Sequence, residues 1–182
     1  MKTLFIDTHL FDIDIILFEN KHIIARKTIE NERYNSIYLV SSLKEVCPDK
    51  EFDEIVVING PGSFTGVRLG VTIAKTLAFT LNKPIKTLSF FDLMNYSSDN
   101  NSHIFGISDG NGYYIAEFDK HLLVKDYYYL NNNEYTVFKE NNKIETDVAI
   151  DFDKVLEELK NVDSINPHLV KPLYIKLIGV EK

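Results

Sequence analysis

A glycine-rich segment that follows an apolar run is the part of the sequence best suited to chemistry. It reads Asn59-Gly-Pro-Gly-Ser-Phe-Thr-Gly-Val-Arg-Leu-Gly70, and a turn of this kind at the start of a helix can hold phosphate on its backbone N–H groups. The nucleoside triphosphate loop needs a second glycine five positions after the first, followed by lysine. Counting from Gly60 leads to Thr65, and counting from Gly62 leads to Val67. The segment therefore does not match this loop.

The dinucleotide fingerprint fails in the same segment. It needs glycine or alanine at position 65, where the chain has Thr65. Pro61 also removes one backbone donor from the turn. Anion capture at this helix start stays open, but phosphate binding is not the favoured interpretation.

Other candidate nucleophiles and metal ligands lack partners at a useful spacing. Ser63 does not stand in a Gly-x-Ser-x-Gly sequence, and Cys47, beside a proline at a predicted helix end, is interpreted as inert. A helical zinc site needs two histidines four positions apart, and no two of the five have this spacing: His9, His22, His103, His121 and His168. We predict no catalytic residue, no metal site and no bound cofactor.

The composition is that of an ordinary globular protein with an acidic balance. The 182 residues include 27 acidic and 20 basic side chains, a formal net charge of −7, and the basic residues form no run that would neutralise a row of phosphates. The single cysteine excludes a disulfide framework within the chain. The most apolar stretch, 69–81, contains Lys75 and is too short to span a bilayer. We expect a cytoplasmic protein that does not bind nucleic acid on its own and has no membrane segment.

The first half of the sequence predicts a strand meander followed by alternating helices and strands. β-Branched and aromatic residues with short polar breaks predict the strands, and apolar residues at helical spacing predict the helices, including a stripe of Ile37, Val40, Leu43 and Val46. Ser89 and Asp92 match a capping box for the last helix. The predicted strands are 4–7, 12–19, 23–30 and 55–58, and the predicted helices are 34–46, 65–81 and 89–96.

The second half predicts a separate sheet after a polar break. The break at 97–102 has nothing apolar to bury, and Asp109-Gly-Asn-Gly112 between two apolar segments is typical of a β-hairpin. The expected elements are strands at 103–108, 113–119 and 122–130, an asparagine-rich loop, and a helix at 152–160. We expect two lobes, an N-terminal one at 1–96 and a smaller C-terminal one at 103–182.

Small residues form a ridge along the helix that follows the glycine-rich turn. Gly66, Gly70, Ala74 and Ala78 recur every four positions and let another backbone come close. A helical glycine costs roughly 1 kcal/mol relative to alanine, so a close contact is expected to compensate. Two interpretations remain open: the small residues fit a crowded interior, or the ridge meets a helix of another subunit.

The glycine-rich segment also carries a family resemblance. Gly60 to Gly70, followed by an alanine-lysine helix, is similar to the signature of the TsaB (YeaZ) family, as are the Ile-Asp-Thr start and the Pro-Leu-Tyr-Ile-Lys sequence that ends at Lys176. The resemblance covers about the first 90 residues and the hairpin at 104–118, whereas 130–167 looks abbreviated. Family members usually carry a histidine near the start of the first helix, where this chain has Arg33-Tyr-Asn-Ser36, so no role of that histidine carries over.

The resemblance implies an α/β fold of the actin-like (ribonuclease H-like) type, two-lobed, with mixed sheets and flanking helices. It implies a non-catalytic subunit that binds a TsaD-like catalytic paralogue, which places threonylcarbamoyl on the tRNA adenosine next to the anticodon. A TsaE-like ATPase joins through the complex, tRNA is contacted only indirectly, and the chain alone forms a homodimer. The expected interface residues are Tyr38, Gly62, Ser63, Thr65, Gly66, Val67, Gly70, Val71, Ala74 and Ala78.

An enzyme acting alone is the alternative. A phosphotransferase of this fold needs a glycine-containing turn after the first strand, and Asp7-Thr-His-Leu-Phe-Asp12 has no glycine, although its two aspartates leave a weak chance of a metal contact. Asp109 to Gly112 fits either a phosphate loop or a plain hairpin turn, and the hairpin is favoured. An actin-fold ATPase or a hydrolase therefore stays as the second hypothesis, and a self-associating protein with no tRNA role stays as a third.

Overall fold

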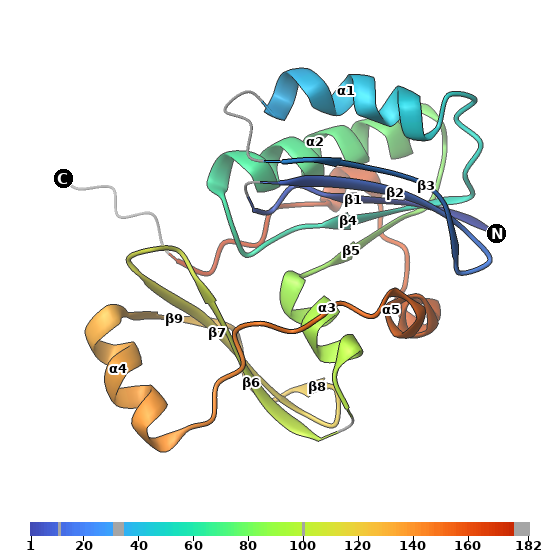
Figure 1. The fold of residues 1–182 in the computed structure, drawn as a ribbon. Helices are drawn as coiled ribbons and strands as arrows, with labels where there is room; N and C mark the ends of the chain where they lie inside the picture. The colour runs from blue at the N-terminus through green and yellow to red at the C-terminus, as the bar shows by residue number, and fades with distance from the viewer. Residues whose placement is uncertain (11, 31–34, 100, 177–182) are drawn as a thin grey trace.

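The computed structural model describes residues 1–10, 12–30, 35–99 and 101–176, which form two sheets with helices packed on them (Figure 1). The strands are β1 (Lys2–Asp7), β2 (Ile13–Glu19), β3 (His22–Ile29), β4 (Glu54–Ile58), β5 (Ile85–Leu88), β6 (Ser102–Ser108), β7 (Gly112–Asp119), β8 (Leu122–Leu123) and β9 (Tyr128–Asn131). The helices are α1 (Asn35–Val46), α2 (Phe64–Thr80), α3 (Phe90–Ser97), α4 (Asn132–Asn141) and α5 (Phe152–Glu158), with 3-10 turns at Leu159–Asn161 and Pro167–Leu169.

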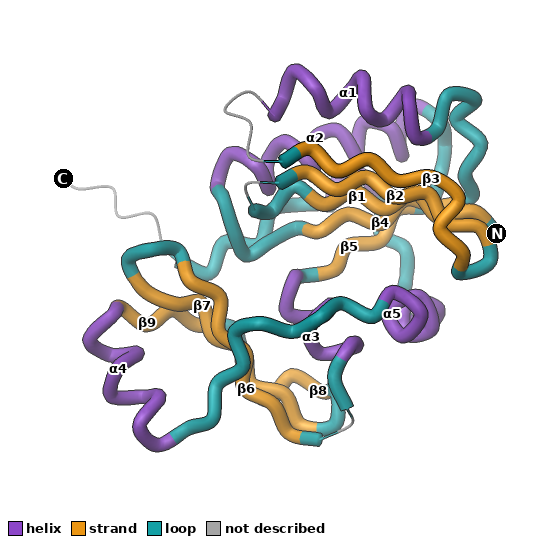
Figure 2. The backbone as a smooth tube through the Cα atoms, in the orientation of Figure 1, coloured by secondary structure: helices purple, strands orange, loops and turns teal. Residues whose placement is uncertain are grey.

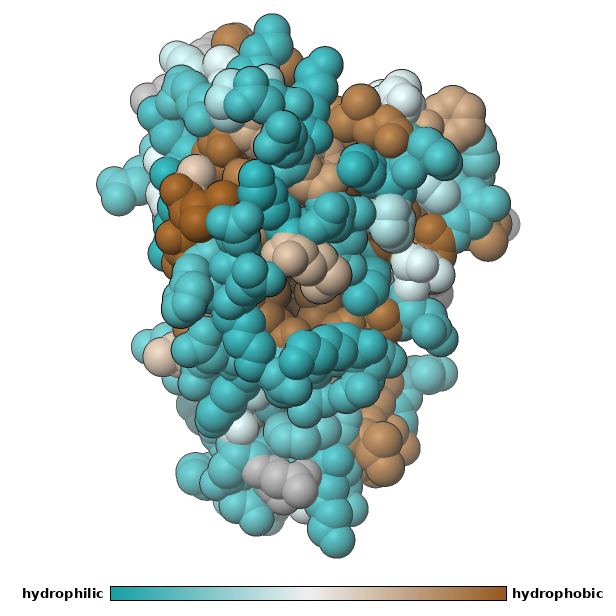
Figure 3. Space-filling view, turned by 90° about the vertical axis from the view of Figure 1, so that its right-hand side faces the viewer, coloured by the Kyte–Doolittle hydropathy of each residue, from teal (hydrophilic) through white to brown (hydrophobic). Residues whose placement is uncertain are grey.

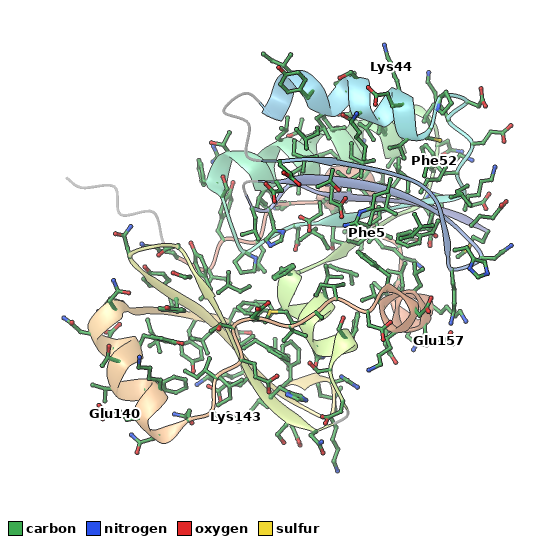
Figure 4. The ribbon with its side chains drawn as sticks, viewed as in Figure 1. Phe5, Lys44, Phe52, Glu140, Lys143 and Glu157 are labelled. Atoms are coloured by element: carbon green, nitrogen blue, oxygen red, sulfur yellow. The ribbon has the colours of Figure 1, made fainter. Side chains whose placement is uncertain are left out.

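The first sheet is mixed and is covered on both faces. Its order in the described residues is β3-β2-β1-β4-β5, with β1, β4 and β5 parallel and the β1–β2–β3 meander antiparallel. Helices α1 and α2 lie on one face, and α3 and α5 lie on the other (Figures 1 and 2). Because successive side chains of a strand point to opposite faces, Leu4 and Ile6 pack beneath α1 and α2, whereas Phe5 packs toward α5 (Figure 4).

The second sheet is antiparallel and has its own core. Strand β7 pairs with β6, β8 and β9, and Phe105 and Phe118 from this sheet pack with Phe91 and Met94 of α3. Helix α4 is joined to the sheet by a stacked pair of rings, Tyr113 and Tyr135, with centroids 3.5 Å apart. The two sheets therefore share α3 as a packing element, since Leu93 of the same helix belongs to the core of the first sheet.

The segment after α4 returns to the first sheet. The ring of Phe152 at the start of α5 packs against Phe5, with centroids 5.5 Å apart, and Ile165 forms a bridge to Ile85 on the β5 edge. Val170 lies in the core beneath α2, and Ile175 packs against the core of the second sheet. The last described residues thus contact both sheets. The division of the chain into two lobes at 97–102 stays a prediction.

The strands and helices predicted for the first half are confirmed to within two residues, and the hairpin at 103–119 is confirmed as well. The capping box of α3 is present, with Ser89 and Asp92 bonded reciprocally. Tyr34, where the sequence predicted a helix to begin, and Arg33 lie outside the described residues. Among the described residues, no helix is long and apolar enough to span a bilayer.

Three local predictions are wrong. The asparagine-rich stretch is the start of α4, because the Asn131 side chain accepts from the N–H groups of Asn133 and Glu134 and caps a helix. The predicted strand at 122–130 is split into β8 and β9. The apolar stripe of α1 is wrong in its first half: Ile37 and Val40 are exposed and Leu39 is buried in their place, whereas Leu43 and Val46 pack on the core.

Candidate partner-binding surface and the β1–β2 turn

The glycine-rich segment leads from β4 into α2 and is fastened to the turn after β1. The backbone N–H of Ser63 donates to the carbonyl of His9 at 2.6 Å. The Ser63 hydroxyl caps α2 by accepting from the N–H of Gly66 at 3.3 Å, and the Thr8 hydroxyl donates to the carbonyl of Gly66 at 2.7 Å. The start of α2 is therefore held by the β1–β2 turn of its own chain.

The small-residue ridge of α2 faces this same turn. A β-carbon on Gly62 would lie 2.0 Å from the carbonyl oxygen of His9, and one on Gly66 would lie 2.1 Å from that of Thr8. A β-carbon on Gly70 would lie 2.2 Å from the Thr8 hydroxyl oxygen. Such distances leave no room for any side chain. The glycines are explained by a close approach within the chain, which is the first of the two interpretations that the sequence left open.

The other members of the ridge, Ala74 and Ala78, lie in the core of the first sheet beside two valines of α2. The residues of α2 that are buried there are Val67, Val71, Ala74 and Ala78. These side chains contact the first sheet of their own chain, and the expectation that the ridge meets a partner stays a prediction. Of the ten residues expected at the interface, Tyr38, Ser63 and Thr65 are exposed.

The β1–β2 turn, in its described part, is closed by a histidine. The imidazole of His9 is buried, stacks on Phe90 with centroids 4.1 Å apart, and places Nδ1 2.5 Å from Oδ1 of Asp7. The same carboxylate oxygen accepts from the His9 backbone N–H at 3.0 Å. Phosphate-holding turns of this fold aim free backbone N–H groups at the ligand, whereas here the N–H of His9 is already bonded to the Asp7 carboxylate.

The polar groups of the β6–β7 turn, at 109–112, also form hydrogen bonds within the chain. Oδ1 of Asp109 accepts from the N–H of Asn111 at 2.9 Å and from the Tyr129 hydroxyl at 2.9 Å, and Oδ2 lies 3.3 Å from Nζ of Lys176. Burial alone would raise the pKa of Asp109, but these donors outweigh it and hold the pKa below its usual value. These contacts favour the hairpin interpretation of 109–112. In the described part of the chain, no group of three or more histidine, cysteine or acidic residues is placed to hold a metal ion.

The outer face of α1 and its junction with α2 carry apolar surface that the sequence prediction missed except at Tyr38. Ile37, Tyr38 and Val40 are 68%, 43% and 50% exposed. Beside them a groove of about 290 Å³ separates α1 from α2, with walls that are almost entirely apolar. Figure 4 shows Lys44 projecting from the outer side of α1 and Phe52 below the end of this helix. We name this feature the α1–α2 groove, and its main apolar lining is Val40, Leu43, Cys47, Phe52, Ile73 and Leu77.

A signal for this surface was present in the sequence. The run Ile37-Tyr-Leu-Val40 is apolar at four consecutive positions, and four consecutive residues point all round a helix. A helix that packs one face on a sheet buries only part of such a run. The remaining side chains must then either be exposed or meet a partner.

Comparisons with known proteins agree with this fold. The family model described as TsaD, tRNA N6-adenosine threonylcarbamoyltransferase, matches residues 40–110. The tRNA threonylcarbamoyladenosine biosynthesis protein TsaB of Bacillus subtilis (strain 168) is 34% identical over 99 residues, which are 52% of this chain and 43% of the relative. The chain thus matches less than half the length of this curated relative.

Two solved structures resemble the chain along nearly its whole length. YeaZ from Pseudomonas aeruginosa superimposes with a TM-score of 0.73 at 14% identity, covering 95% of this chain and 100% of that one. A crystal structure of a Pseudomonas aeruginosa protein with similarity to peptidase YeaZ gives a TM-score of 0.72 at 14% identity, covering 96% and 99%. The actin-like α/β fold is confirmed. The glycine-rich signature and the 34% identity to the Bacillus protein support assignment of the chain to the TsaB (YeaZ) family.

Proposed function

We propose that this chain is a non-catalytic, cytoplasmic subunit of the machinery that makes threonylcarbamoyladenosine in tRNA, and that it binds a TsaD-like catalytic protein. The observation that carries the proposal is the exposed apolar surface of α1 beside the α1–α2 groove. The names of the Bacillus relative and of the matching family model support the pathway. A subunit of this kind acts by holding its partner in an active arrangement.

The chemistry of the surface suits a helix of another protein. Large apolar side chains that stay exposed together on a soluble protein mark an interaction site, and a groove next to them accepts an apolar anchor from the partner. Ile37 and Tyr38 would form the raised part of the contact, and Val40 the wall of the groove. A second copy of the chain presents the same face, which supports a homodimer when the catalytic partner is absent.

The closed β1–β2 turn supports a binding role over catalysis by this chain. The His9 ring is buried against Asp7, and the same carboxylate engages the His9 backbone N–H, which would otherwise be available to a phosphate. The net charge of −7 disfavours direct contact with tRNA. In this proposal the catalytic protein holds the tRNA, and a TsaE-like ATPase joins through the complex.

A charge placed in the groove tests the surface. Val40→Asp should weaken binding to the TsaD-like protein of the same genome by at least about 100-fold, because the carboxylate loses water against apolar walls. Val137→Asp, on the exposed side of α4, introduces the same charge at a residue that is 62% exposed and serves as the matched control. Size-exclusion chromatography with light scattering, followed by calorimetry, would measure association. Equal affinity of the two variants would refute the proposed surface.

The pathway is tested separately in cells. Depletion of the protein should remove threonylcarbamoyladenosine from digested tRNA, as measured by mass spectrometry, and the Val137→Asp gene should restore it while the Val40→Asp gene does not. Calorimetry of the isolated chain with ATP and magnesium addresses the alternative of an autonomous ATPase. Tight nucleotide binding by the chain alone would favour that alternative.

A further inference from the structure

A second cavity, of about 320 Å³, opens on the other face of the first sheet, at the end where the parallel strands begin. Figure 3 faces this side of the molecule and shows a hollow with a hydrophobic floor inside a largely hydrophilic surface. Its apolar lining includes Phe18 of β2, Leu156 of α5 and Leu159 of the following turn. All three are buried. The cavity has the size and the mostly apolar lining of a small-molecule site, and the sheet separates it from the α1–α2 groove.

One wall of the cavity holds a buried ion pair. Nζ of Lys86 lies 3.1 Å from Oε2 of Glu54, and the two side chains are only 13% and 7% exposed. The hydroxyl of Thr3 donates to Oε1 of Glu54 at 2.9 Å, and Lys86 also donates to the carbonyl of Leu159 at 3.0 Å. An ammonium has three N–H donors, and in the described part of the chain these two contacts engage two of them. The third donor of Lys86 is available to a ligand in the cavity.

Two further lysines stand at the rim and share one carboxylate. Lys21, in the β2–β3 turn, pairs with Glu157 of α5, and Nζ of Lys160 lies 2.9 Å from the same carboxylate. Figure 4 shows Glu157 on the outer side of α5. Both lysines lower the pKa of Glu157 to about 2, so this carboxylate stays charged. Asp153 also acts on Lys21 through its charge, so the two rim lysines face two carboxylates.

The balance of charge at the cavity is opposite to that of the whole chain. The positive groups are Lys21, Lys86, Lys160 and the N-terminal ammonium of Met1, and the negative groups are Glu54, Asp153 and Glu157. The cavity therefore has one positive charge in excess, whereas the whole chain carries −7. A local excess of positive charge over an apolar floor attracts a molecule with an anionic end and an apolar body.

We infer that this cavity binds a small organic monoanion, a carboxylate with an aromatic or aliphatic body. The carboxylate lies between Lys86 and the rim lysines, and the apolar body lies on Phe18, Leu156 and Leu159. The inference does not depend on the proposed function, because no residue of the cavity belongs to the α1–α2 groove.

Nuclear magnetic resonance titration of the full chain with 3-phenylpropionate tests the site. Saturable shifts are expected at the amides of Thr3, Glu54, Lys86 and Leu156. The neutral probe 3-phenyl-1-propanol, which has the same body, should bind at least about tenfold more weakly, because it lacks the charge that the lysines recognise.

Variants of the rim lysines distinguish recognition of the ligand's charge from nonspecific binding in an apolar cavity. Lys21→Gln with Lys160→Gln should weaken phenylpropionate binding about threefold to tenfold and leave binding of the alcohol unchanged. Lys139→Gln with Lys143→Gln, an equal charge change on and beside α4, is the matched control and should bind phenylpropionate normally. All four lysines are on the surface, so the spectra should show intact folds. Absence of saturable shifts, equal affinity for acid and alcohol, or an unaffected rim variant would each overturn the inference.

Discussion

The hydroxyl oxygen of Thr8 stands 2.2 Å from the place where a β-carbon on Gly70 would lie. Thr8 is buried at the end of the β1 region, and its hydroxyl donates to the carbonyl of Gly66 one turn earlier in α2. The first strand and the signature helix are thus in contact through a position that admits no side chain. This contact explains why the glycine is present and predicts the effect of replacing it.

Gly70→Ala should lower the free energy of unfolding by about 1 kcal/mol. The steric overlap of the new β-carbon with Thr8 costs about 1–3 kcal/mol. The higher helix propensity of alanine offsets about 1 kcal/mol of this cost. In a Thr8→Ala background the overlapping oxygen is gone, so the same change should be neutral or stabilising. Urea unfolding of the four proteins in the cycle measures the coupling. Additive effects would mean that Thr8 is not the group that excludes the side chain.

His103 should make stability depend on pH. Burial by itself lowers the pKa of this histidine, but hydrogen bonds to Glu145 and Asp99, at 2.8 and 2.9 Å, outweigh burial and raise the pKa above its usual value. The stabilisation that protonated His103 gains from these hydrogen bonds is fully present below about pH 6.5. It is lost as the pH rises through the pKa of His103 in the folded protein. His103→Gln should therefore cost more stability at pH 5.5 than at pH 8.5.

Urea unfolding at the two pH values measures this difference. His22→Gln, at an exposed histidine of β3, is the control for a general effect of removing an imidazole. A larger loss at pH 8.5 than at pH 5.5 would show that the histidine is held in its neutral form. The hydrogen bond from His103 lowers the pKa of Asp99, which keeps this carboxylate charged at pH 5.5.

The segment from Val170 to Ile175 should couple the two sheets. Val170 is buried under α2, the N–H of Leu173 donates to the carbonyl of Asn59 at 2.7 Å, and Ile175 packs on the core of the second sheet. Ile175→Ala should cost about 1 kcal/mol, less than a fully buried isoleucine because the side chain is only partly covered. Hydrogen exchange should become faster in β6 and β7 than in α1.

Leu169→Ala provides the comparison for this segment, because Leu169 is exposed beside it. Its exchange pattern should match that of the unchanged protein. If Ile175→Ala accelerates exchange equally in both sheets, the segment does not act on the second sheet in particular.

Asn131→Ala should loosen α4 by about 1 kcal/mol. The side chain accepts from the N–H groups of Asn133 and Glu134, each at 3.0 Å, and the Glu134 carboxylate accepts from the N–H of Asn131. Because no residue of α4 is fully buried, the cap is a large share of what holds this helix. Exchange of the amides at the start of α4 measures the effect. Asn133→Ala, one position inside the helix, should leave exchange nearly unchanged.

Much of the fold followed from local patterns in the sequence. β-Branched runs with short polar breaks determined the β1–β2–β3 meander, and Ser89 with Asp92 marked the start of α3, because strand and cap preferences act between neighbouring residues. The asparagines at 131–133 were misjudged for a related reason: the same side chain caps a helix or stabilises a turn, and the packing of Tyr135 on Tyr113 favours the helix.

The glycine-rich segment was sufficient by its spacing to exclude the standard phosphate loops and to indicate the family. Only the tertiary structure decided which way the ridge of α2 faces. The ridge meets Thr8, a residue 62 positions before Gly70. The periodic spacing of small residues indicates that another backbone segment comes close, but it does not identify that segment. The same reason left the exposed face of α1 unassigned: Ile37 and Val40 are as apolar as the buried Leu39, and only the position of the sheet determines which of them is covered.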